Sequence, residues 1–325
     1  MFNALKNYST LFLSLNTVTV PLVGNTDVTI PMVGVPPLSS HDPYYNLDPE
    51  PLLDFNNDPP FYYGPTPKKA RSHCCNGCGE RGYGVRIVGG TPAQRHSSPW
   101  LARLLYRNSF GCGASIVNTR HVITAAHCVK GFMWFMFRVT FGEHDRCSTV
   151  LADARYVVSV AAHNFSLSDL RNDIALLKLS SSAVYSNAVK PICLPKNDLN
   201  TYAGVKGLVA GWGATAETGN WSCTLLQAEM PVLEQSDCRR TSYNANKIAD
   251  DMLCAGYPTT AEKDACTGDS GGPLIADTGK RVYELIGVVS WGYGCARKGF
   301  PGIYTRVSKY LDWIKDNTDS CYCTS

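Results

Sequence analysis

The sequence predicts an all-β fold that follows an N-terminal segment with little regular structure. From residue 87 onward, short apolar runs rich in Val and Ile recur between Gly, Asn, Asp and Ser, the pattern of strands separated by turns. Residues 1–86 instead combine many prolines with acidic side chains. About 240 residues of short strands fit either a β-sandwich or two packed barrels, and the chain contains no internal repeat.

The N-terminal segment has the composition of a linker. Eleven of the nineteen prolines lie before residue 68, and residues 37–60 hold five acidic residues and no Lys or Arg. Such a segment buries too little apolar surface to order itself, so we expect it to be largely disordered. The basic cluster that follows is interpreted as a solvated patch, with a processing site as the alternative. Its members are Lys68, Lys69 and Arg71.

The strands are expected in the apolar runs downstream of this segment. These runs are WLARLLY (100–106), ASIVN (114–118), HVITAA (121–126), RYVVSV (155–160), DIALLKL (173–179), GLVAGWG (207–213), YELIGVVSWG (283–292) and GIYTRV (302–307). A helix is expected near residues 308–318, where Tyr310, Leu311 and Ile314 share one face and Ser308 is a suitable N-cap. No apolar run approaches the ~20 residues of a membrane span, and the run at residues 11–15 is short for a secretory leader.

The fourteen cysteines indicate a disulfide framework. None precedes Cys74, and no spacing has the paired form of a zinc site. An even number of dispersed cysteines is typical of proteins that fold in an oxidising compartment, so we expect a secreted, extracellular protein. The net charge of +3 is small, and no basic stripe alternates with aromatic residues, which leaves nucleic-acid binding without support.

A candidate nucleophile, Ser270, lies in DACTGDSGGPL, residues 264–274. A serine hydroxyl reacts at neutral pH only when a base takes its proton and a third group orients that base. Two segments offer these groups, because His127 follows an apolar strand in TAAHC and Asp173 opens another in NDIALL. Each residue alone is more often structural, as a core histidine or a turn cap. The occurrence of all three segments in one chain favours nucleophilic catalysis.

Residues 86–314 resemble the trypsin-like serine proteases of the chymotrypsin fold. The matching segments are RIVGG, TAAHC, DIALL, GWG, CAGY, DACTGDSGGPL, VVSWG and PGIYTRV. The resemblance implies two packed six-stranded antiparallel β-barrels with a C-terminal helix. It also implies that Ser270 attacks the scissile carbonyl, that His127 acts as general base and then acid, and that Asp173 orients the imidazole. The N–H groups of Gly268 and Ser270 would form an oxyanion hole.

The same resemblance implies cleavage after Arg or Lys. Asp264 matches the floor of the primary specificity pocket, where its carboxylate would face the basic side chain of the substrate. The residues that match the pocket walls are Ser290, Gly292 and Gly302. Protein or peptide substrates with Arg or Lys before the cut, together with protein inhibitors, are therefore the expected partners.

The segment RIVGG implies a zymogen, with a prosegment of residues 1–86 and a protease domain of residues 87–325. Cleavage after Arg86 by an upstream protease with Arg preference would free the ammonium group of Ile87, whose expected partner is Asp269. The rival interpretation is a catalytically silent relative that serves as a binding scaffold. Such proteins usually lack one of the three catalytic residues, and this chain has all three.

Five disulfides follow from the resemblance and from the fold that it implies. Three match common bridges of the family, namely Cys112–Cys128, Cys238–Cys254 and Cys266–Cys295. Cys78–Cys193 matches the link between prosegment and protease in two-chain relatives, and Cys147–Cys223 is an additional bridge between loops that the fold places near one another. Two links between residues 74/75 and 321/323 are expected as well, and their pairing stays open.

No cofactor and no metal are expected. Glu143 and Asp153 match a calcium loop of trypsins, but Arg146 and Cys147 interrupt that loop. The candidate glycosylation sites, which open N-x-S sequons, are Asn164 and Asn220.

Overall fold

The structure is a computed structural model of the 325-residue chain. It describes residues 17–20, 28–31, 77–82, 91–148, 153–260, 262–279, 281–319 and 321–325. The chain divides into two compact units, Met1–Lys69 and Ala70–Ser325. In the first unit, strand β1 (Thr17–Val20) pairs antiparallel with β2 (Val28–Pro31), a hairpin that the sequence did not predict. Several residues with expected roles lie outside the described residues, namely Cys74, Cys75, Arg86 and Ile87.

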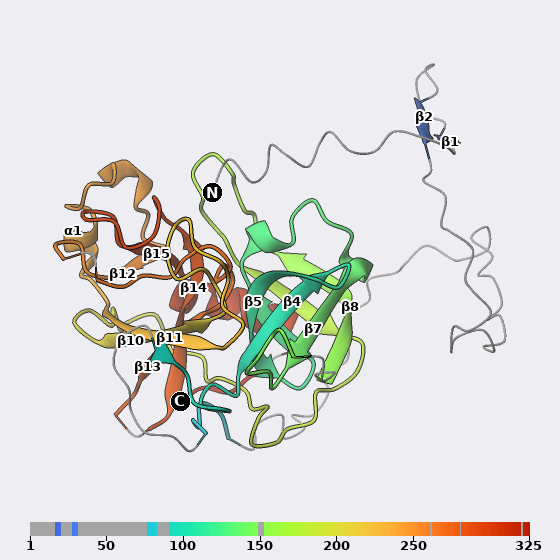
Figure 1. Cartoon of the computed structure of the whole chain (residues 1–325), viewed down its shortest axis with the longest axis horizontal. Helices are drawn as coiled ribbons and strands as arrows, with labels where there is room; N and C mark the ends of the chain where they lie inside the picture. Colours follow the sequence, from blue (N-terminus) through green and yellow to red (C-terminus); the bar gives the residue numbers. More distant parts are fainter. Residues whose placement is uncertain are drawn as a thin grey trace. The chain divides into compact units, whose positions relative to one another are not determined.

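Six strands of the second unit form a closed antiparallel barrel (Figure 1). In barrel order they are β4 (Leu101–Tyr106), β5 (Ser109–Asn118), β6 (His121–Thr124), β9 (Ala175–Leu179), β8 (Asp153–Ala162) and β7 (Phe137–Phe141). Strand β6 is buried along its whole length, whereas only Val157 is buried in β8. One side of this barrel is therefore covered by protein, and the β8 side faces solvent.

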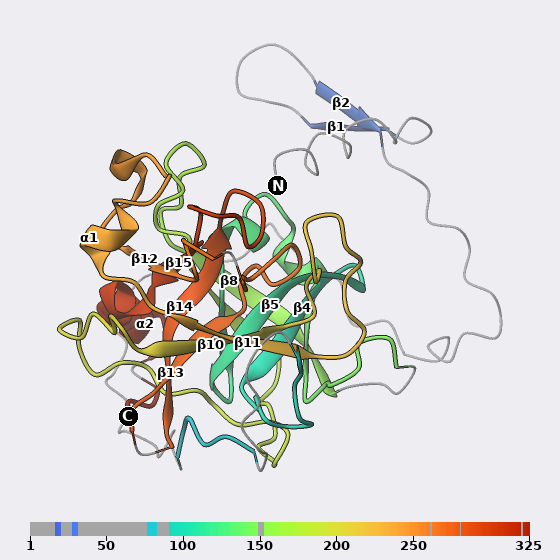
Figure 2. The ribbon, with the colours of Figure 1, turned by 60° about the vertical axis from the view of Figure 1, so that its left-hand side comes forward.

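The remaining long strands form a second barrel (Figure 2). In sheet order they are β12 (Met252–Ala255), β15 (Gly302–Arg306), β14 (Tyr283–Trp291), β13 (Pro273–Asp277), β10 (Lys206–Gly211) and β11 (Leu226–Pro231), with the two-residue β3 (Thr91–Pro92) at the end. An antiparallel bridge between Val232 and Ala255 joins the chain after β11 back to β12. The prediction of two six-stranded antiparallel barrels is confirmed.

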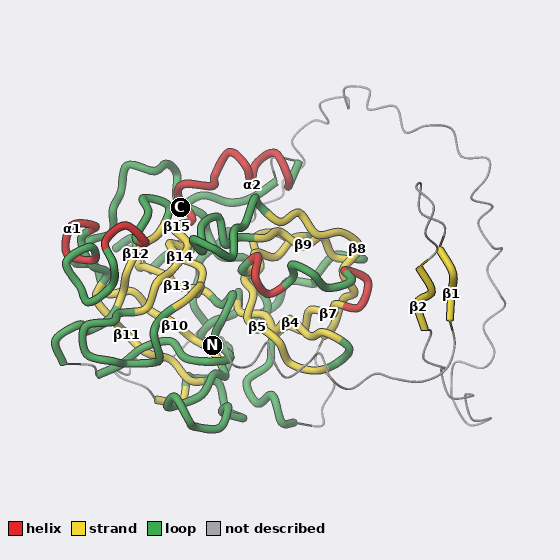
Figure 3. The backbone as a smooth tube through the Cα atoms, turned by 90° about the horizontal axis from the view of Figure 1, so that it is seen from above, coloured by secondary structure: helices red, strands yellow, loops and turns green. Residues whose placement is uncertain are grey.

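One hydrophobic cluster extends from the first barrel to part of the second barrel and the C-terminal helix, whereas most of the second barrel's interior forms separate clusters. Trp100 and Leu177 of the first barrel belong to the same buried cluster as Val288 of β14 and Ile314 of α2 (Leu311–Asn317). In Figure 3 the strands of the second unit form two yellow groups, and α2 lies near β9. Ring contacts of His163 with Tyr310 and Trp313 attach the helix region to the chain that follows β8.

The helix begins later than the sequence predicted. A 3₁₀ turn, η5 (Val307–Tyr310), precedes α2 and contains Ser308. The Ser308 hydroxyl is buried and has no hydrogen-bond partner in the described part of the chain. The prediction of Ser308 as the N-cap is therefore wrong, because the chain already turns at Val307.

Four other short helical turns lie in the loops. They are η2 (Ala126–Cys128), η3 (Trp134–Met136), α1 (Gln235–Cys238) and η4 (Ala245–Lys247). Among the described residues, no helix is both long enough and apolar enough to cross a membrane.

Five disulfides join described cysteines. They are Cys78–Cys193, Cys112–Cys128, Cys147–Cys223, Cys238–Cys254 and Cys266–Cys295, the pairs that the resemblance and its fold imply. Cys321 and Cys323 are also disulfide-bonded. The chain next to Cys193 lies beside the C-terminal tail, because Leu194 forms a bridge with Thr324.

The two barrels touch at glycines on both sides of the interface. A Cβ on Gly113 of β5 would lie 2.8 Å from the Cα atom of Gly272. Gly271 has a φ of +76°, and a Cβ there would lie 2.2 Å from Oγ1 of Thr124 and 2.6 Å from the Gly113 carbonyl oxygen. The N–H of Gly113 donates to the Ser270 carbonyl at 2.8 Å. The two glycines after Ser270 thus allow its loop to lie directly on the first barrel.

Replacement of Gly271 by Ala should lower the free energy of unfolding by about 2–4 kcal/mol, through backbone strain at positive φ and overlap with Thr124. Gly279 is a matched control, because its φ is +89° and no atom lies within 4 Å of a Cβ there. Gly279→Ala should cost only about 1 kcal/mol, the strain of the backbone alone. Equal losses in denaturant unfolding would contradict the close packing of Gly271.

Candidate active site

The register of two strands brings His127 and Asp173 together. Strands β6 and β9 pair antiparallel with Thr124 opposite Ala175, so the residues after β6 meet those before β9. Nδ1 of His127 lies 2.7 Å from Oδ2 of Asp173, and the backbone N–H of His127 donates to Oδ1 at 2.8 Å. These two contacts orient the imidazole and favour the tautomer with its proton on Nδ1.

The second barrel also contributes to the environment of Asp173. The Ser290 hydroxyl donates to Oδ2 at 2.5 Å, and the Thr305 hydroxyl donates to the backbone carbonyl of Asp173 at 2.7 Å. Burial alone would raise the pKa of Asp173, but the neighbouring His127 and the hydrogen bonds outweigh it and hold the pKa below its usual value. Asp173 is therefore ionised at neutral pH although it is only 2% exposed.

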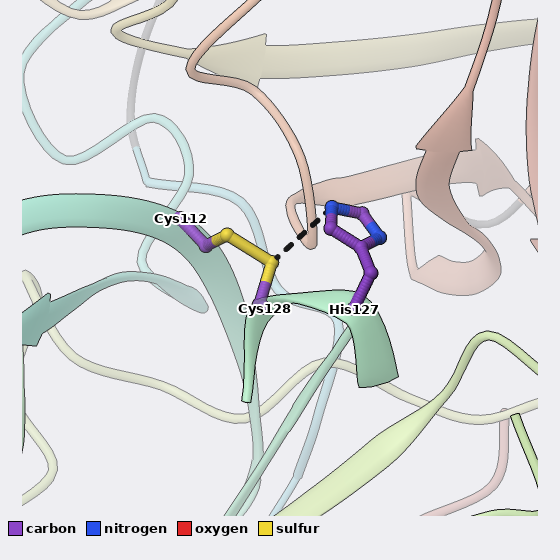
Figure 4. A group of neighbouring side chains, drawn as sticks. All are labelled: Cys112, His127 and Cys128. Carbon is purple, nitrogen blue, oxygen red and sulfur yellow. Dashed lines mark hydrogen bonds between the residues drawn. A yellow bond between two sulfur atoms is a disulfide. The ribbon is translucent and has the colours of Figure 1, made fainter. Parts of the chain in front are cut away.

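A disulfide lies against the ring of His127 (Figure 4). Cys112 of β5 is bonded to Cys128, and Sγ of Cys128 lies 3.6 Å from Nε2 of His127. The three residues cluster like metal ligands, but both sulfurs are already used in the disulfide. Only the imidazole of His127 therefore remains as a possible metal ligand in this cluster. The disulfide Cys112–Cys128 links η2 to β5.

Ser270 lies at the junction of the barrels, in the loop before β13, and is 5% exposed. A Cβ on the next residue, Gly271, would lie 3.1 Å from the backbone nitrogen of Ala125, just before η2. This contact brings the serine loop against the turn that carries His127. Within the described chain, the Ser270 hydroxyl makes no hydrogen bond to His127 or to any other group. Such contacts are often long when no substrate is bound.

Two backbone N–H groups in the loop that carries Ser270 donate no hydrogen bond within the described chain. Of the five N–H groups in residues 268–272, three donate to backbone carbonyls. Those of Gly268 and Ser270 have no acceptor among the described residues. Gly268 has a φ of +102°, and a Cβ there would lie 3.3 Å from Nε1 of Trp221. The loop thus presents two free donors that can bind an anionic oxygen.

Asp264 is a largely buried carboxylate with no cationic partner among the described residues. Its Oδ2 accepts from the N–H of Ala296 at 3.0 Å, whereas the buried Oδ1 has no hydrogen-bond partner in the described chain. Gly302 faces this oxygen, because a Cβ there would lie 2.6 Å from Oδ1. Burial raises the pKa of Asp264 to about 7. An unpaired buried acceptor of this kind attracts a cationic group.

The other two residues expected beside Asp264 lie at the end of β14. The side chain of Ser290 is buried and bonded to Asp173, a contact that the sequence did not predict. Gly292 follows β14, and the nearest atoms to a Cβ there are the Gly294 carbonyl oxygen at 3.6 Å and the Tyr243 hydroxyl at 3.7 Å. A methyl group would fit at Gly292, and a larger side chain would fill the space near Tyr243.

Asp269 is held by backbone groups alone within the described chain. Its Oδ1 accepts from the N–H of Gly213 at 2.9 Å and its Oδ2 from the N–H of Cys266 at 3.0 Å. Burial outweighs these bonds and raises the pKa of Asp269 to about 6. Its expected partner, Ile87, lies outside the described residues.

An ion pair that the sequence did not predict joins two loops of the second barrel. Glu217, in the loop at residues 213–224, accepts from Arg297 at 2.5 and 2.7 Å. The bond to Arg297 lowers the pKa of Glu217 to about 2. The disulfide Cys147–Cys223 fixes the other end of this loop to the first barrel. No local pattern marks Glu217 and Arg297, because they are 80 residues apart.

Both carboxylates of the interrupted calcium loop bind guanidinium groups. Arg103 pairs with Glu143 through two nitrogens, one of them at 2.7 Å, and Arg155 pairs with Asp153. These carboxylates are thus neutralised by side chains of the protein itself.

Two antiparallel barrels, with a His–Asp pair and a buried serine at their junction, are the arrangement of the chymotrypsin-fold serine proteases. Residues 87–314 match the model of the family described as Trypsin. The chain is 43% identical to Trypsin-1 of Astacus astacus over 242 residues, which cover 71% of this chain and 99% of that protein. The chain therefore belongs to the trypsin family of serine proteases.

Two further relatives have longer chains. Phenoloxidase-activating enzyme 1 of Spodoptera litura is 35% identical over 266 residues, which cover 75% of this chain and 70% of that protein. The proclotting enzyme of Tachypleus tridentatus is 37% identical over 250 residues, which cover 72% of this chain and 66% of that protein.

Ionisation of Asp264 and Asp269 should lower the free energy of unfolding of the intact chain as the pH rises from about 4 to about 7, against a smaller opposite contribution from His121, whose pKa burial lowers to about 4. The carboxyls of Asp264 and Asp269 have raised pKa values of about 7 and about 6 in the folded chain, whereas an unfolded Asp titrates near 4. The folded state therefore binds more protons in this window and becomes less stable as both groups ionise. Denaturant unfolding at several pH values measures this slope.

Asp264→Asn should flatten the upper part of that slope. Asp316→Asn is a matched control, because Asp316 is an exposed carboxylate on α2. The same pH dependence in both variants would contradict the assignment of a raised pKa to Asp264.

Proposed function

We propose that this serine endopeptidase cleaves proteins or peptides after Arg or Lys, and that it is a secreted zymogen activated by cleavage between Arg86 and Ile87. The observation that carries the specificity is the largely buried, unpaired carboxylate of Asp264. A guanidinium or ammonium group beside it would supply the missing partner. Such a charge-assisted pair is strong where water is largely excluded. Secretion is supported by the disulfides, which persist in oxidising surroundings.

His127 would act first as general base and then as general acid. With its Nδ1 proton bonded to ionised Asp173, Nε2 has a free lone pair for the proton of Ser270. Oγ of Ser270 then attacks the scissile carbonyl, and the proton passes from Nε2 to the leaving amine as the peptide bond breaks. Water hydrolyses the acyl-enzyme in the same way, giving one proton to Nε2 and returning Ser270 to its hydroxyl form.

The N–H groups of Gly268 and Ser270 would bind the carbonyl oxygen as it becomes negatively charged. Both donors are unused by the described chain, so they need not break an internal hydrogen bond before they act. One such donor typically stabilises the transition state by about 3 kcal/mol.

Activation would act through Asp269, which lies in the sequence between Gly268 and Ser270, the residues whose N–H groups would bind the carbonyl oxygen. Its burial makes an unpaired charge costly, as its pKa of about 6 indicates. The ammonium group freed at Ile87 would neutralise that charge and hold Gly268 and Ser270 in their active positions. The upstream enzyme would share the preference for Arg.

The prosegment would stay attached after activation. Cys78 is bonded to Cys193. The N–H of Gly79 donates to the Pro191 carbonyl, and the Gly79 carbonyl accepts from the N–H of Tyr283, each at 2.9 Å. Cleavage further along the chain would break none of these contacts. The product would therefore be a two-chain enzyme.

Replacement of either Ser270 or His127 by Ala should lower kcat by about 10⁶, with little further loss in the double variant, because the catalytic groups act as a unit. Steady-state kinetics of the activated enzyme measures both effects. Covalent labelling by a serine-directed inhibitor should disappear in Ser270→Ala. Absence of labelling in the activated wild-type enzyme would contradict the proposed catalysis.

The variant Asp264→Ser should lose the preference for Arg and Lys, with a fall of about 10²–10⁴ in kcat/KM, because the basic side chain would be buried without a counter-charge. Peptide substrates that differ only in the residue before the cut give the ratio directly. Preserved selectivity would exclude Asp264 as the determinant.

The variant Arg86→Gln should give a folded protein without activity, since no ammonium group is freed. Activated wild-type protein should run as one band on a non-reducing gel and as two bands after reduction, because Cys78–Cys193 joins the two chains. Full activity of the variant would contradict activation at this site, and two bands without reductant would contradict the two-chain product.

A further inference from the structure

An exposed group of large apolar side chains lies at one end of the first barrel. Of the eleven such side chains exposed in the described part of the chain, six gather there. These six, which we call the aromatic patch, are Phe132, Met133, Trp134, Phe135, Tyr156 and Val158. Their exposed fractions range from 40% to 58%. Soluble monomers rarely expose contiguous apolar surface of this kind unless it binds something.

The patch has the form of a protruding turn. Four of its members are consecutive in the chain between η2 and β7, and each is about half exposed. Phe132 packs the turn against β4, since its ring centroid lies 4.9 Å from that of Tyr106. Trp134 and Phe135 meet edge to face at 5.6 Å beyond it. The turn η3 contacts β8, which supplies Tyr156 and Val158; Figure 3 shows it as the red turn beside β8.

The rim of the patch is basic. Arg107 lies over the ring of Tyr106 at 5.8 Å, and Arg138 lies over the ring of Tyr156 at 5.3 Å. Arg138 also donates to the neutral side chain of Asn108. Among the described residues, neither arginine forms an ion pair, so their positive charge is not compensated within the protein.

We infer that the aromatic patch binds the surface of membranes that contain anionic lipids. Aromatic side chains favour the boundary between headgroups and acyl chains, where an apolar ring can be buried beside a polar layer. Arginines at the rim attract anionic headgroups. The patch therefore combines apolar insertion with basic charge, the two signals that stable peripheral binding requires. No membrane-spanning helix is involved.

Lipid fits this surface better than a protein partner does. Protein interfaces depend on dense packing against a complementary surface. The planes of the Trp134 and Phe135 rings meet at 90°, and a fluid lipid layer accommodates such a surface without a preformed shape. The patch directly follows η2, so binding holds the turn that carries His127 close to the lipid surface.

The test is flotation of the full chain with phosphatidylcholine vesicles that contain or lack phosphatidylserine, at low and physiological salt. The wild-type chain should bind the vesicles that contain phosphatidylserine. The double variant Trp134→Ser/Phe135→Ser should lower the partition coefficient by at least about tenfold. Arg107→Gln/Arg138→Gln should lower it by about fivefold per arginine and weaken its salt dependence.

The matched control is Val184→Ser/Leu199→Ser, which removes two exposed apolar side chains outside the patch. It should bind as the wild-type chain does, and thermal unfolding should show that all variants are folded. The inference fails if the wild-type chain does not bind phosphatidylserine vesicles at physiological salt. It also fails if binding is unchanged in both patch variants, or if the control loses as much binding as they do. If the wild-type chain does not bind vesicles and a patch variant alters peptide cleavage, the aromatic patch contacts substrate instead.

Discussion

The need to satisfy one buried charge, the carboxylate of Asp173, determines how the two barrels meet. His127 of the first barrel and Ser290 of the second both donate to it, and Thr305 binds its backbone. A buried carboxylate that lost these donors would destabilise the fold by several kcal/mol. Asp264 lacks such a partner among the described residues, so a cationic group from outside completes its environment.

Several strands were predicted from long apolar runs, whereas the shorter β7, β12 and β13 were not among the predicted runs although they are mostly buried. Strands β6, β9, β14 and β15 lie within runs rich in Val, Ile and Leu. Strand β11 was not predicted, because its sequence LQAEMP mixes polar and apolar residues and only two of its positions are fully buried. Its pairing with β10, and not its own composition, makes it a strand. The pairing of β1 with β2 was not predicted either, because each strand has only four residues and so short a run is a weak signal.

The three candidate catalytic residues were predicted from three local segments, each with a distinctive sequence, and the pocket residues from the family resemblance. Contacts between segments were not visible in this way. The bond from Ser290 to Asp173 and the pair Glu217–Arg297 join residues far apart in the chain, and tertiary structure alone brings them together. The run FMWFM at residues 132–136 is entirely apolar, and the exposure of its first four residues depends on the path of the turn between η2 and β7.

The loop at residues 213–224 has a consequence for the lifetime of the enzyme. A protease at high concentration meets copies of itself, and exposed loops are where such cuts begin. This loop is tied at Cys147–Cys223 and at Glu217–Arg297, so it cannot open locally without breaking one of these links. The chain also has no Lys or Arg between Lys206 and Arg239. For an enzyme with the proposed specificity, the loop beside its own catalytic serine is therefore resistant to self-digestion.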